Sequence, residues 1–336
     1  MRQTIGDIAL AAGVSTATVD RVLNDRQGVR DLTRARVIAA ARAVGYLPET
    51  GPDTPPIRLD FVLQSGPNTF MDLLAAHLAS LGAARSTEIA LHVHRVDGFS
   101  PEALVASLRE LRGTSGGIGI IALDHPLVRE AIRETAAAGT PVLTMVSDIA
   151  QAPRLAYVGI DNRNAGRLAG HLLGRFVPGS EGEVALFAGS LSYRGHEERE
   201  MGFRHILADE FPGLKIVELR EVRDDLERSY RAAKATLTAH PQLRGIYNIG
   251  AGNRGIARAL QEAGRDQEVV FIGHELTPHT RVFLLAGVMD AVIDQNPRVE
   301  AREAVDRLLS AARGNAGPDP VAVRIHAIFR ENLPDL

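Results

Sequence analysis

The 336-residue sequence contains no cysteine and no tryptophan, and aromatic residues make up only 4% of it. The absence of cysteine excludes disulfide bonds, catalysis by a thiol and metal sites built on cysteine, and it is compatible with a reducing cytoplasm. The low aromatic content argues against a ligand that needs several stacked rings, such as a purine.

The sequence also lacks long apolar runs and an overall excess of positive charge. The longest apolar stretch, near Ile118–Leu123, suits a buried strand and is far shorter than a membrane span. The N-terminus carries Asp7 and no continuous apolar segment, so we expect no secretory signal and a cytoplasmic protein. The formal net charge of −3 means that the chain as a whole is not a polycation.

Charge is nevertheless distributed unevenly along the chain. Residues 1–50 contain seven arginines and five acidic residues, so this segment is basic and the remainder is acidic. A basic head on an acidic body predicts a polyanionic partner for the head alone. Four prolines within Pro48–Arg58 predict a semi-rigid linker, because proline lacks a backbone donor and blocks helix. We therefore expect a head domain at 1–48, a linker at 49–57 and a core at 58–336.

Beyond the linker, short apolar runs alternate with longer helical patterns. Runs such as "IRLDFVLQ", "GIGIIAL" and "GEVALFAG" are each followed by ten or more residues with helical periodicity. This alternation predicts α/β architecture with parallel sheets covered by helices. The series is too long for one small sheet, so two lobes in tandem are expected.

The head has the pattern of a helix-turn-helix. Thr4 is a capping residue for a first helix, and Gly13 stands where a tight turn must follow. Ser15 is placed to cap a second helix, Thr16–Leu23, and a third is expected at about Asp31–Val44. In this motif the second helix enters the major groove with its N-terminal residues leading.

The segments "TIGDIA", "AGVSTATVDRVLN" and "TRARVIAAARAVGYLP" resemble the DNA-binding domain of LacI/GalR-family transcriptional regulators. The resemblance implies base contacts from Thr16, Ala17 and Arg21 and phosphate contacts from Thr4, Ser15, Thr18 and Asn24. An arginine fork on guanine, and hydroxyl groups with a helix N-terminus on phosphate, suit these roles. The implied partner is double-stranded operator DNA, read as a pseudo-palindrome by a homodimer.

Two features depart from the family pattern. Asp20 stands where relatives usually have serine, and its carboxylate can orient Arg21 or accept from cytosine. The proline-rich linker replaces the usual hinge helix, with Pro55 near the position of a leucine that wedges into the minor groove. The minor-groove kink is therefore expected to be absent or made differently.

The rest of the chain resembles the sensor core of the same family, which is built like type I periplasmic binding proteins. The resemblance implies two lobes joined by three crossovers, with the N-lobe at about 58–158 and 296–318. The C-lobe is implied at about 159–294 and 319–336. In such sheets, ligands bind beyond the carboxyl ends of the strands, in the cleft between the lobes.

Polar and aromatic residues at these strand ends are the predicted effector contacts. By the resemblance they are Asn68, Phe70, Asp148, Arg199, Asn248, Asn253, His274, Glu275 and Gln295. Carboxylates and amides bind pairs of hydroxyls, arginine forks onto a ring oxygen or carboxylate, and aromatic rings stack on sugar faces. The expected effector is therefore carbohydrate-like: a sugar, a polyol or a sugar acid.

An alternative starts from Gly250-x-Gly252-x-x-Gly255, which has dinucleotide-binding spacing, with Glu275 about twenty residues on. It describes a nucleotide- or sugar-phosphate-binding enzyme. A dinucleotide-binding glycine motif follows the first strand of its lobe. The motif at Gly250 follows a later strand, so this alternative is disfavoured.

No metal, cofactor or enzyme site is expected elsewhere. "HELTPH" fails the zinc motif in spacing, and the pair His92 and His94 has no evident third ligand. The sequence therefore predicts a non-enzymatic, effector-controlled DNA-binding regulator of the repressor type.

Overall fold

The computed structural model describes residues 4–24, 26, 28–47, 55–179, 181–315 and 323–334. The chain divides into two compact units, Met1–Pro56 and Ile57–Leu336, which we call the head and the core and describe separately. Within the described residues, we find no helix with the length and apolar character that crossing a bilayer requires.

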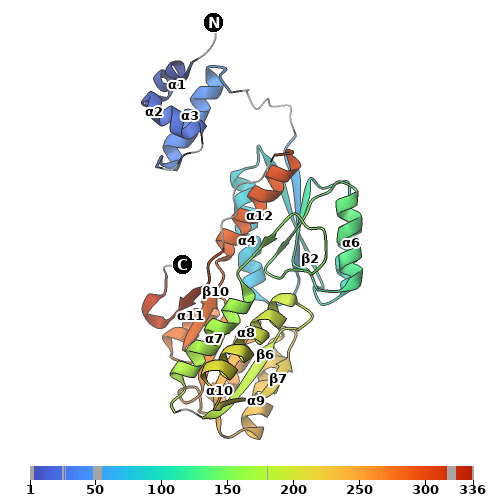
Figure 1. Cartoon of the computed structure of the whole chain (residues 1–336), viewed down its shortest axis with the longest axis vertical. Coiled ribbons are helices and arrows are strands. Elements are labelled where there is room, and N and C mark those ends of the chain that lie inside the picture. The colour runs from blue at the N-terminus through green and yellow to red at the C-terminus, as the bar shows by residue number, and fades with distance from the viewer. Residues whose placement is uncertain are drawn as a thin grey trace. The chain divides into compact units, whose positions relative to one another are not determined.

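The head is a three-helix unit made of α1 (Ile5–Ala12), α2 (Thr16–Leu23) and α3 (Asp31–Ala43) (Figure 1). Thr4 and Asp7 form a capping box at the start of α1, and Ser15 Oγ accepts from Thr18 N at the start of α2. Gly13, with φ of 64°, ends α1 in the left-handed conformation that glycine adopts without strain. The predicted helix-turn-helix is confirmed, with a small core that includes the fully buried Ile8, Val19, Val37 and Ala41.

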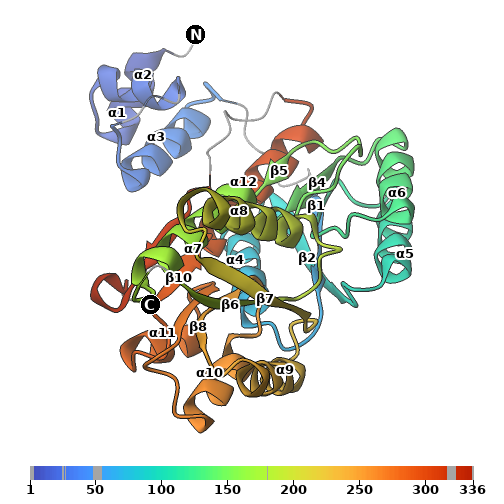
Figure 2. The same ribbon diagram turned by 60° about the horizontal axis from the view of Figure 1, so that its bottom comes forward.

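The first lobe of the core, the N-lobe, contains a parallel sheet in the order β2-β1-β3-β4-β5. Its strands are β1 (Ile57–Gln64), β2 (Ile89–Val96), β3 (Gly117–Ile120), β4 (Val142–Met145) and β5 (Tyr157–Val158). Its helices are α4 (Thr69–Ala84), α5 (Pro101–Leu111), α6 (Pro126–Ala137) and α12 (Pro297–Ala312). Helix α12 packs beside α4, and α5 packs beside α6 on the other face of the sheet (Figure 2).

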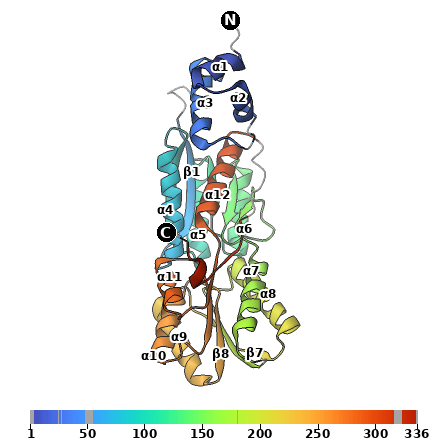
Figure 3. The ribbon, with the colours of Figure 1, turned by 90° about the vertical axis from the view of Figure 1, so that its left-hand side faces the viewer.

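The second lobe, the C-lobe, contains a sheet in the order β11-β10-β9-β8-β6-β7. Its strands are β6 (Gly182–Ala188), β7 (Leu214–Glu221), β8 (Leu243–Asn248), β9 (Val270–His274), β10 (Ala291–Asp294) and β11 (His326–Ile328). Its helices are α7 (Asn162–Phe176), α8 (Arg194–Glu210), α9 (Leu226–Ala239), α10 (Asn253–Glu262) and α11 (Pro278–Leu285), with a 3-10 turn at Arg330–Asn332. Figure 3 shows α7 and α8 on this lobe and α4 and α12 on the N-lobe.

The predicted two-lobed α/β architecture is thus confirmed, with one refinement. Strand β11 pairs antiparallel with β10, so the C-lobe sheet is parallel except at this edge. The chain returns to the N-lobe through α12, a helix that the sequence reasoning did not delimit. The lobe boundaries within crossover segments stay predictions, and part of the last crossover lies outside the described residues.

The predicted linker at 49–57 needs a correction at its end. Ile57 already belongs to β1, because its backbone N–H donates to Glu88 O at 2.9 Å and it pairs with Ile89. Residues 49–54 lie outside the described part of the chain. Pro55, named above for the minor-groove position, is exposed and belongs to no regular element.

Glycines allow α7 and α8 to pack unusually closely. A Cβ at Gly166 would lie 1.9 Å from the Arg199 carbonyl oxygen, and one at Gly202 would lie 2.0 Å from the Arg163 carbonyl oxygen. Each glycine therefore lets the backbone of the opposite helix come close, at a point where any side chain would collide with it. This packing fixes the position of Arg199 on α8.

The Gly166→Ala substitution should destabilise the core. The added methyl must displace α8, and overpacking of this kind costs about 1–3 kcal/mol, which exceeds alanine's advantage over glycine in helix propensity. Urea unfolding of the full chain measures the loss. Arg175→Ala, at an exposed site on the same helix, should stay within about 0.5 kcal/mol of wild type. Equal stability of the wild type and Gly166→Ala would contradict the packing argument.

Candidate functional site

A cavity lies between the two lobes, where the carboxyl ends of strands from both sheets meet. The N-lobe wall contains Gln64, Asn68, Phe70, Met71, Ile121, Val146 and Ser147. The C-lobe wall contains Tyr193, Gly195, His196, Arg199, Asp224, Ile249, Gly250, Ala251, His274 and Glu275, and Gln295 lines the cavity from the crossover after β10. The cavity volume of about 40 Å³ is far below the roughly 300–1,000 Å³ of typical small-molecule sites. At this cavity the two lobes are therefore close together, whereas a second hollow between them, lined by Phe99, Asp124, Ser190 and Arg223 among others, has a volume of about 330 Å³.

Arg199 is the central charge of the cavity. Its side chain is 3% exposed, and its guanidinium donates from Nε to Asn162 Oδ1 at 2.7 Å and from Nη1 to Ile249 O at 3.0 Å. A longer contact of 3.5 Å joins Nη2 to Gln295 Oε1. These acceptors are all neutral and come from α7, the loop after β8 and the crossover. A rigid guanidinium can thus hold three elements in register around a ligand.

Glu275 and Gln295 form a second part of the site. Gln295 Nε2 donates to Glu275 Oε1 at 2.6 Å, and Glu275 Oε2 is buried with no hydrogen-bond partner among the described residues. Burial raises the pKa of Glu275 to about 8, an effect that the nearby Arg199 opposes. The carboxyl group is therefore mostly protonated at neutral pH, and Oε2 is available to a ligand hydroxyl.

His274, directly before Glu275, is neutral in this setting. Burial lowers its pKa well below the usual value, and the positive charge of Arg199 lowers it further. Its Nε2 lies 2.8 Å from the hydroxyl of Tyr247, and its Nδ1 is buried without a partner in the described residues. Unpaired buried polar atoms are unfavourable, so these two atoms on adjacent cavity residues are open to a hydrogen bond from a ligand or from water.

Asp224 is a cavity residue that the sequence reasoning missed. It is 7% exposed, its Oδ2 accepts from Asn68 Nδ2 at 3.2 Å, and its Oδ1 accepts from Ala251 N at 2.9 Å. Burial raises the pKa of its carboxyl group, and these two donors counteract the rise. The bond from Asn68 crosses from the N-lobe to the C-lobe. Asp224 lies just beyond the end of β7, so examining the residues after every strand would have identified it.

Further hydrogen bonds hold the lobes together at the cavity. Tyr193 OH donates to Gly98 O at 2.7 Å, and Gly195 N donates to Ser147 Oγ at 3.1 Å. Tyr193 and Ser147 line the cavity, and neither was predicted. An entering ligand of sugar size must break or lengthen some of these contacts, because the closed cavity has too little room for it.

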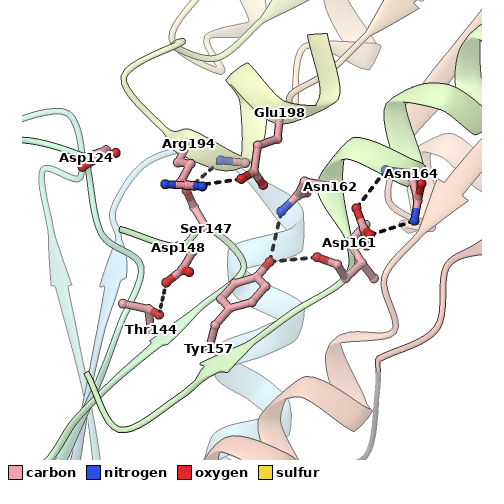
Figure 4. A network of polar contacts seen from close by, with 12 residues as sticks. Asp124, Thr144, Ser147, Asp148, Tyr157, Asp161, Asn162, Asn164, Arg194 and Glu198 are labelled. Carbon is pink, nitrogen blue, oxygen red and sulfur yellow. Dashed lines mark hydrogen bonds and ion pairs between the residues drawn. The ribbon is translucent and has the colours of Figure 1, made fainter. Parts of the chain in front are cut away.

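The predicted effector residues fall into two groups. Asn68, Phe70, Arg199, His274, Glu275 and Gln295 line the cavity, whereas Asp148, Asn248 and Asn253 do not. Asp148 instead forms an ion pair with Arg154 and accepts from Thr144 Oγ1 at 2.7 Å (Figure 4). The backbone turns at Val146, where φ is 64°, and this turn brings Val146 and Ser147 to the cavity in place of Asp148.

Asn248 and Asn253 support the cavity wall from behind. Asn248 Nδ2 donates to Asn253 Oδ1 at 2.7 Å and to Gly250 O at 2.9 Å, and Asn253 Nδ2 donates to His274 O at 3.0 Å. These bonds fix the loop after β8 against the end of β9. Asn253 also lines an adjoining cavity of about 30 Å³, which shares Asn68, Phe70, Ala251, His274 and Glu275 with the first.

The glycines of the dinucleotide-like loop have mainly a packing role. A Cβ at Gly255 would lie 2.3 Å from Leu226 O, and one at Gly252 would lie 2.5 Å from Ser229 Oγ, so both glycines let α10 approach α9. Gly250 lines the cavity and packs against Asp224. Of the three glycines, only Gly250 lines the cavity, and Gly252 and Gly255 do not.

The two histidines of β2 do not form a site together. His94 Nε2 lies 2.7 Å from Asp60 Oδ1, and His92 is exposed. The described part of the chain holds no group of three or more histidine, aspartate or glutamate side chains arranged to bind a metal ion.

The head presents the predicted DNA-facing residues at or near its surface. Thr4, Ser15, Thr16, Ala17, Arg21 and Asn24 are exposed, and Thr18 and Asp20 are partly exposed. Asp20 does not contact Arg21. Its carboxylate accepts from Asn24 Nδ2 at 2.8 Å and pairs with Arg26 Nη1 at 3.2 Å, both within or just beyond α2. The arginine that Asp20 orients is thus Arg26, and the Arg21 side chain extends into solvent.

Comparisons with known families divide the chain in the same way. The family described as "Periplasmic binding protein domain" matches residues 62–316, and "Bacterial regulatory proteins, lacI family" matches residues 4–49. The head is 58% identical over 45 residues to the ribose operon repressor of Bacillus subtilis, which is 13% of this chain and 14% of that protein.

The core is similar to sugar-binding proteins. It is 29% identical over 168 residues to the D-ribose/D-allose-binding protein of Pseudomonas aeruginosa, which is 49% of this chain and 50% of that protein. The chain therefore spans about half the length of this relative. A solute-binding protein of Burkholderia graminis, solved with D-arabinose, superposes with a TM-score of 0.77 at 24% identity, covering 83% of this chain and 98% of that one. At this identity the superposition shows the fold alone.

The raised pKa of Glu275 makes a prediction about pH. Between the usual value of 4.5 and about 8, the folded protein holds a proton that the unfolded chain releases, so stability falls as pH rises through this window. Glu275→Gln removes that contribution. The free energy of unfolding of wild type relative to Glu275→Gln should decrease with pH, by at most about 1.4 kcal/mol per pH unit. Urea unfolding at pH 5 to 9 measures the difference, and parallel pH profiles would contradict the assignment.

Proposed function

The chain belongs to the periplasmic binding protein domain family and carries a lacI-family domain at its N-terminus, and from this premise we propose a sequence-specific transcriptional regulator of the repressor type. Its operator affinity is controlled by a small carbohydrate-like effector bound between the lobes of the core. The observation that supports the proposal is that one chain contains both a helix-turn-helix head and a core with a polar cavity between two lobes.

The head binds double-stranded operator DNA through α2. Thr16, Ala17 and Arg21 reach base edges, and Thr4, Ser15, Thr18 and Asn24 contact phosphates. The free, exposed side chain of Arg21 supports a base contact, since arginine binds guanine through two parallel donors. The carboxylate of Asp20 pairs with Arg26, which leaves Arg21 available for the DNA. One head offers few contacts, so the protein acts as a homodimer on two half-sites.

The cavity binds the effector. Arg199, Gln295, Glu275 and His274 supply hydrogen bonds from the C-lobe and the crossover, and Phe70 contributes an apolar face from the N-lobe. The relatives named above are described as a D-ribose/D-allose-binding protein and a ribose operon repressor, which supports a sugar-sized effector. Binding changes the contacts between Asn68 and Asp224 and between Tyr193 and Gly98, and so the arrangement of the lobes. The protein works in the cytoplasm, where it meets both DNA and imported sugars.

Selection from a randomised pool of duplex DNA, followed by fluorescence anisotropy at fixed salt, tests the proposal. The expected outcome is a pseudo-palindromic sequence bound at least about 1,000-fold more tightly than random duplex. Enrichment of no sequence would overturn the proposed function.

Replacing Arg21 with alanine should reduce this discrimination. Loss of a bidentate base contact costs about 1–3 kcal/mol, roughly a 5- to 150-fold loss of affinity for the selected site with little change for random DNA. Arg42→Ala, at an exposed arginine of α3, is the matched control. It should leave the ratio of specific to non-specific affinity unchanged. An equal ratio in wild type and Arg21→Ala would contradict the base-reading role.

A thermal-shift screen over monosaccharides, polyols and sugar acids tests the cavity. At least one compound should raise the Tm of the wild type, and Arg199→Lys should abolish the shift because an ammonium cannot reach Asn162, Ile249 and Gln295 together. Arg194→Lys, on the same helix outside the cavity, should keep the shift. A retained shift in Arg199→Lys would remove Arg199 from the site.

A further inference from the structure

The N-lobe wall of the cavity is mainly apolar. Four of its residues, Phe70, Met71, Ile121 and Val146, are apolar, and the wall contains no charged side chain. Of its polar residues, Asn68 uses Oδ1 to accept from Phe70 N at 3.1 Å, and its Nδ2 donates across the cleft to Asp224 in this arrangement of the lobes.

The two other polar residues of this wall keep some hydrogen-bonding capacity. Ser147 Oγ accepts from Gly195 N at 3.1 Å, which leaves its hydroxyl hydrogen free to donate, and the side-chain amide of Gln64 has no hydrogen bond within the described residues. A ligand hydroxyl that faces the apolar stretch of Phe70, Met71, Ile121 and Val146 would nevertheless lose its water without gaining a partner, which is unfavourable.

Val146, an apolar residue of this wall, has an unusual backbone conformation. Its φ of 64° lies in the left-handed region, which β-branched residues avoid and which asparagine and aspartate tolerate. The strained backbone is held in place, because Val146 N donates to Val158 O at 3.0 Å and Val146 O accepts from Asn162 Nδ2 at 3.4 Å. A valine here accepts backbone strain at a position that lines the cavity. Strain of this kind in a ligand clamp points to a role in recognition.

The opposite wall, formed by the C-lobe and the crossover, is rich in polar and charged side chains. Arg199, Asp224, His274 and Glu275 all come from the C-lobe, and Gln295 joins them from the crossover. Glu275 Oε2 and His274 Nδ1 are both buried without a partner in the described residues. A ligand in the cavity therefore meets hydrogen-bonding groups along one edge and methyl, thioether and ring carbons along the other.

We propose that the effector is a deoxy monosaccharide, whose hydroxyl-bearing edge faces the C-lobe and whose deoxygenated edge, a methyl or methylene group, packs against Val146 and its apolar neighbours. This inference rests on the proposed function, in that it names the class of sugar that the regulator senses. It makes Val146 a specificity-determining residue. Fully hydroxylated sugars of the same stereochemistry are rejected because one hydroxyl would be buried without a partner.

The test uses sugar pairs that differ by one oxygen atom: L-rhamnose with L-mannose, L-fucose with L-galactose, and 2-deoxy-D-ribose with D-ribose. Isothermal titration calorimetry with the full chain gives the Kd for each sugar. At least one deoxy sugar should bind about 10-fold or more tightly than its hydroxylated partner. Equal or tighter binding of the hydroxylated partner in every pair, or binding of none of the six sugars, would overturn the proposal.

Two variants of Val146 show whether the preference arises at this wall. Val146→Thr keeps the shape and adds one hydroxyl, and it should narrow the preference for the deoxy sugar by several-fold. Val146→Asn suits the left-handed backbone, so it should fold well and should remove or reverse the preference. Val282→Thr, at an exposed site on α11, should bind as wild type does. An undiminished preference in both Val146 variants would contradict the assigned role.

Selection of operator DNA distinguishes failure of the deoxy-sugar inference from failure of the proposed function. The DNA selection described above needs no sugar. If it succeeds and no sugar pair shows the expected preference, the deoxy-sugar inference is rejected and the proposed regulator function stands. Failure of the DNA selection would reject the regulator, even if a deoxy sugar binds the core.

Discussion

The buried guanidinium of Arg199 is the interaction on which the cavity depends. It joins α7, the end of β8 and the crossover after β10 through acceptors that have no charge of their own. Its charge also acts on the neighbouring titratable groups: it adds to the effect of burial in lowering the pKa of His274, and it opposes the rise in the pKa of Glu275. Its position in turn depends on Gly166 and Gly202, which let α7 and α8 meet backbone to backbone. A packing feature of two helices therefore determines the electrostatics of the site.

Three residues that line the same cavity have a strained, left-handed backbone conformation. Val146, Asp224 and Glu275 all have positive φ without being glycine, and all three line it. Each stands beyond the end of a strand, where the chain must turn sharply to bring a side chain into the cleft. Strained residues persist only where their surroundings fix them, as the hydrogen bonds of Val146 and Asp224 do here. Closing the lobes adds further restraints, because the bond from Asn68 reaches Asp224 across the cleft.

Much of the fold followed from local patterns, and less of the site did. The caps Thr4 and Ser15 and the turn at Gly13 located the head helices, and alternating apolar runs located most strands. The resemblance to the sensor core led to Arg199, Glu275 and Gln295, which line the cavity. Asp148 was misplaced because the left-handed turn at Val146 cannot be seen in a sequence. Asp224 was missed because only tertiary packing tells which residue of the loop after β7 turns inward.

Coupling between the cavity and the head is the central claim, and linked binding tests it most directly. The measurement is the affinity of the full chain for its selected operator with and without saturating effector, together with the affinity for effector with and without operator. The account predicts that the two ratios are equal and lie in the range of about 5- to 150-fold, because coupling between sites is reciprocal. Operator affinity that does not change when the cavity is occupied would contradict it.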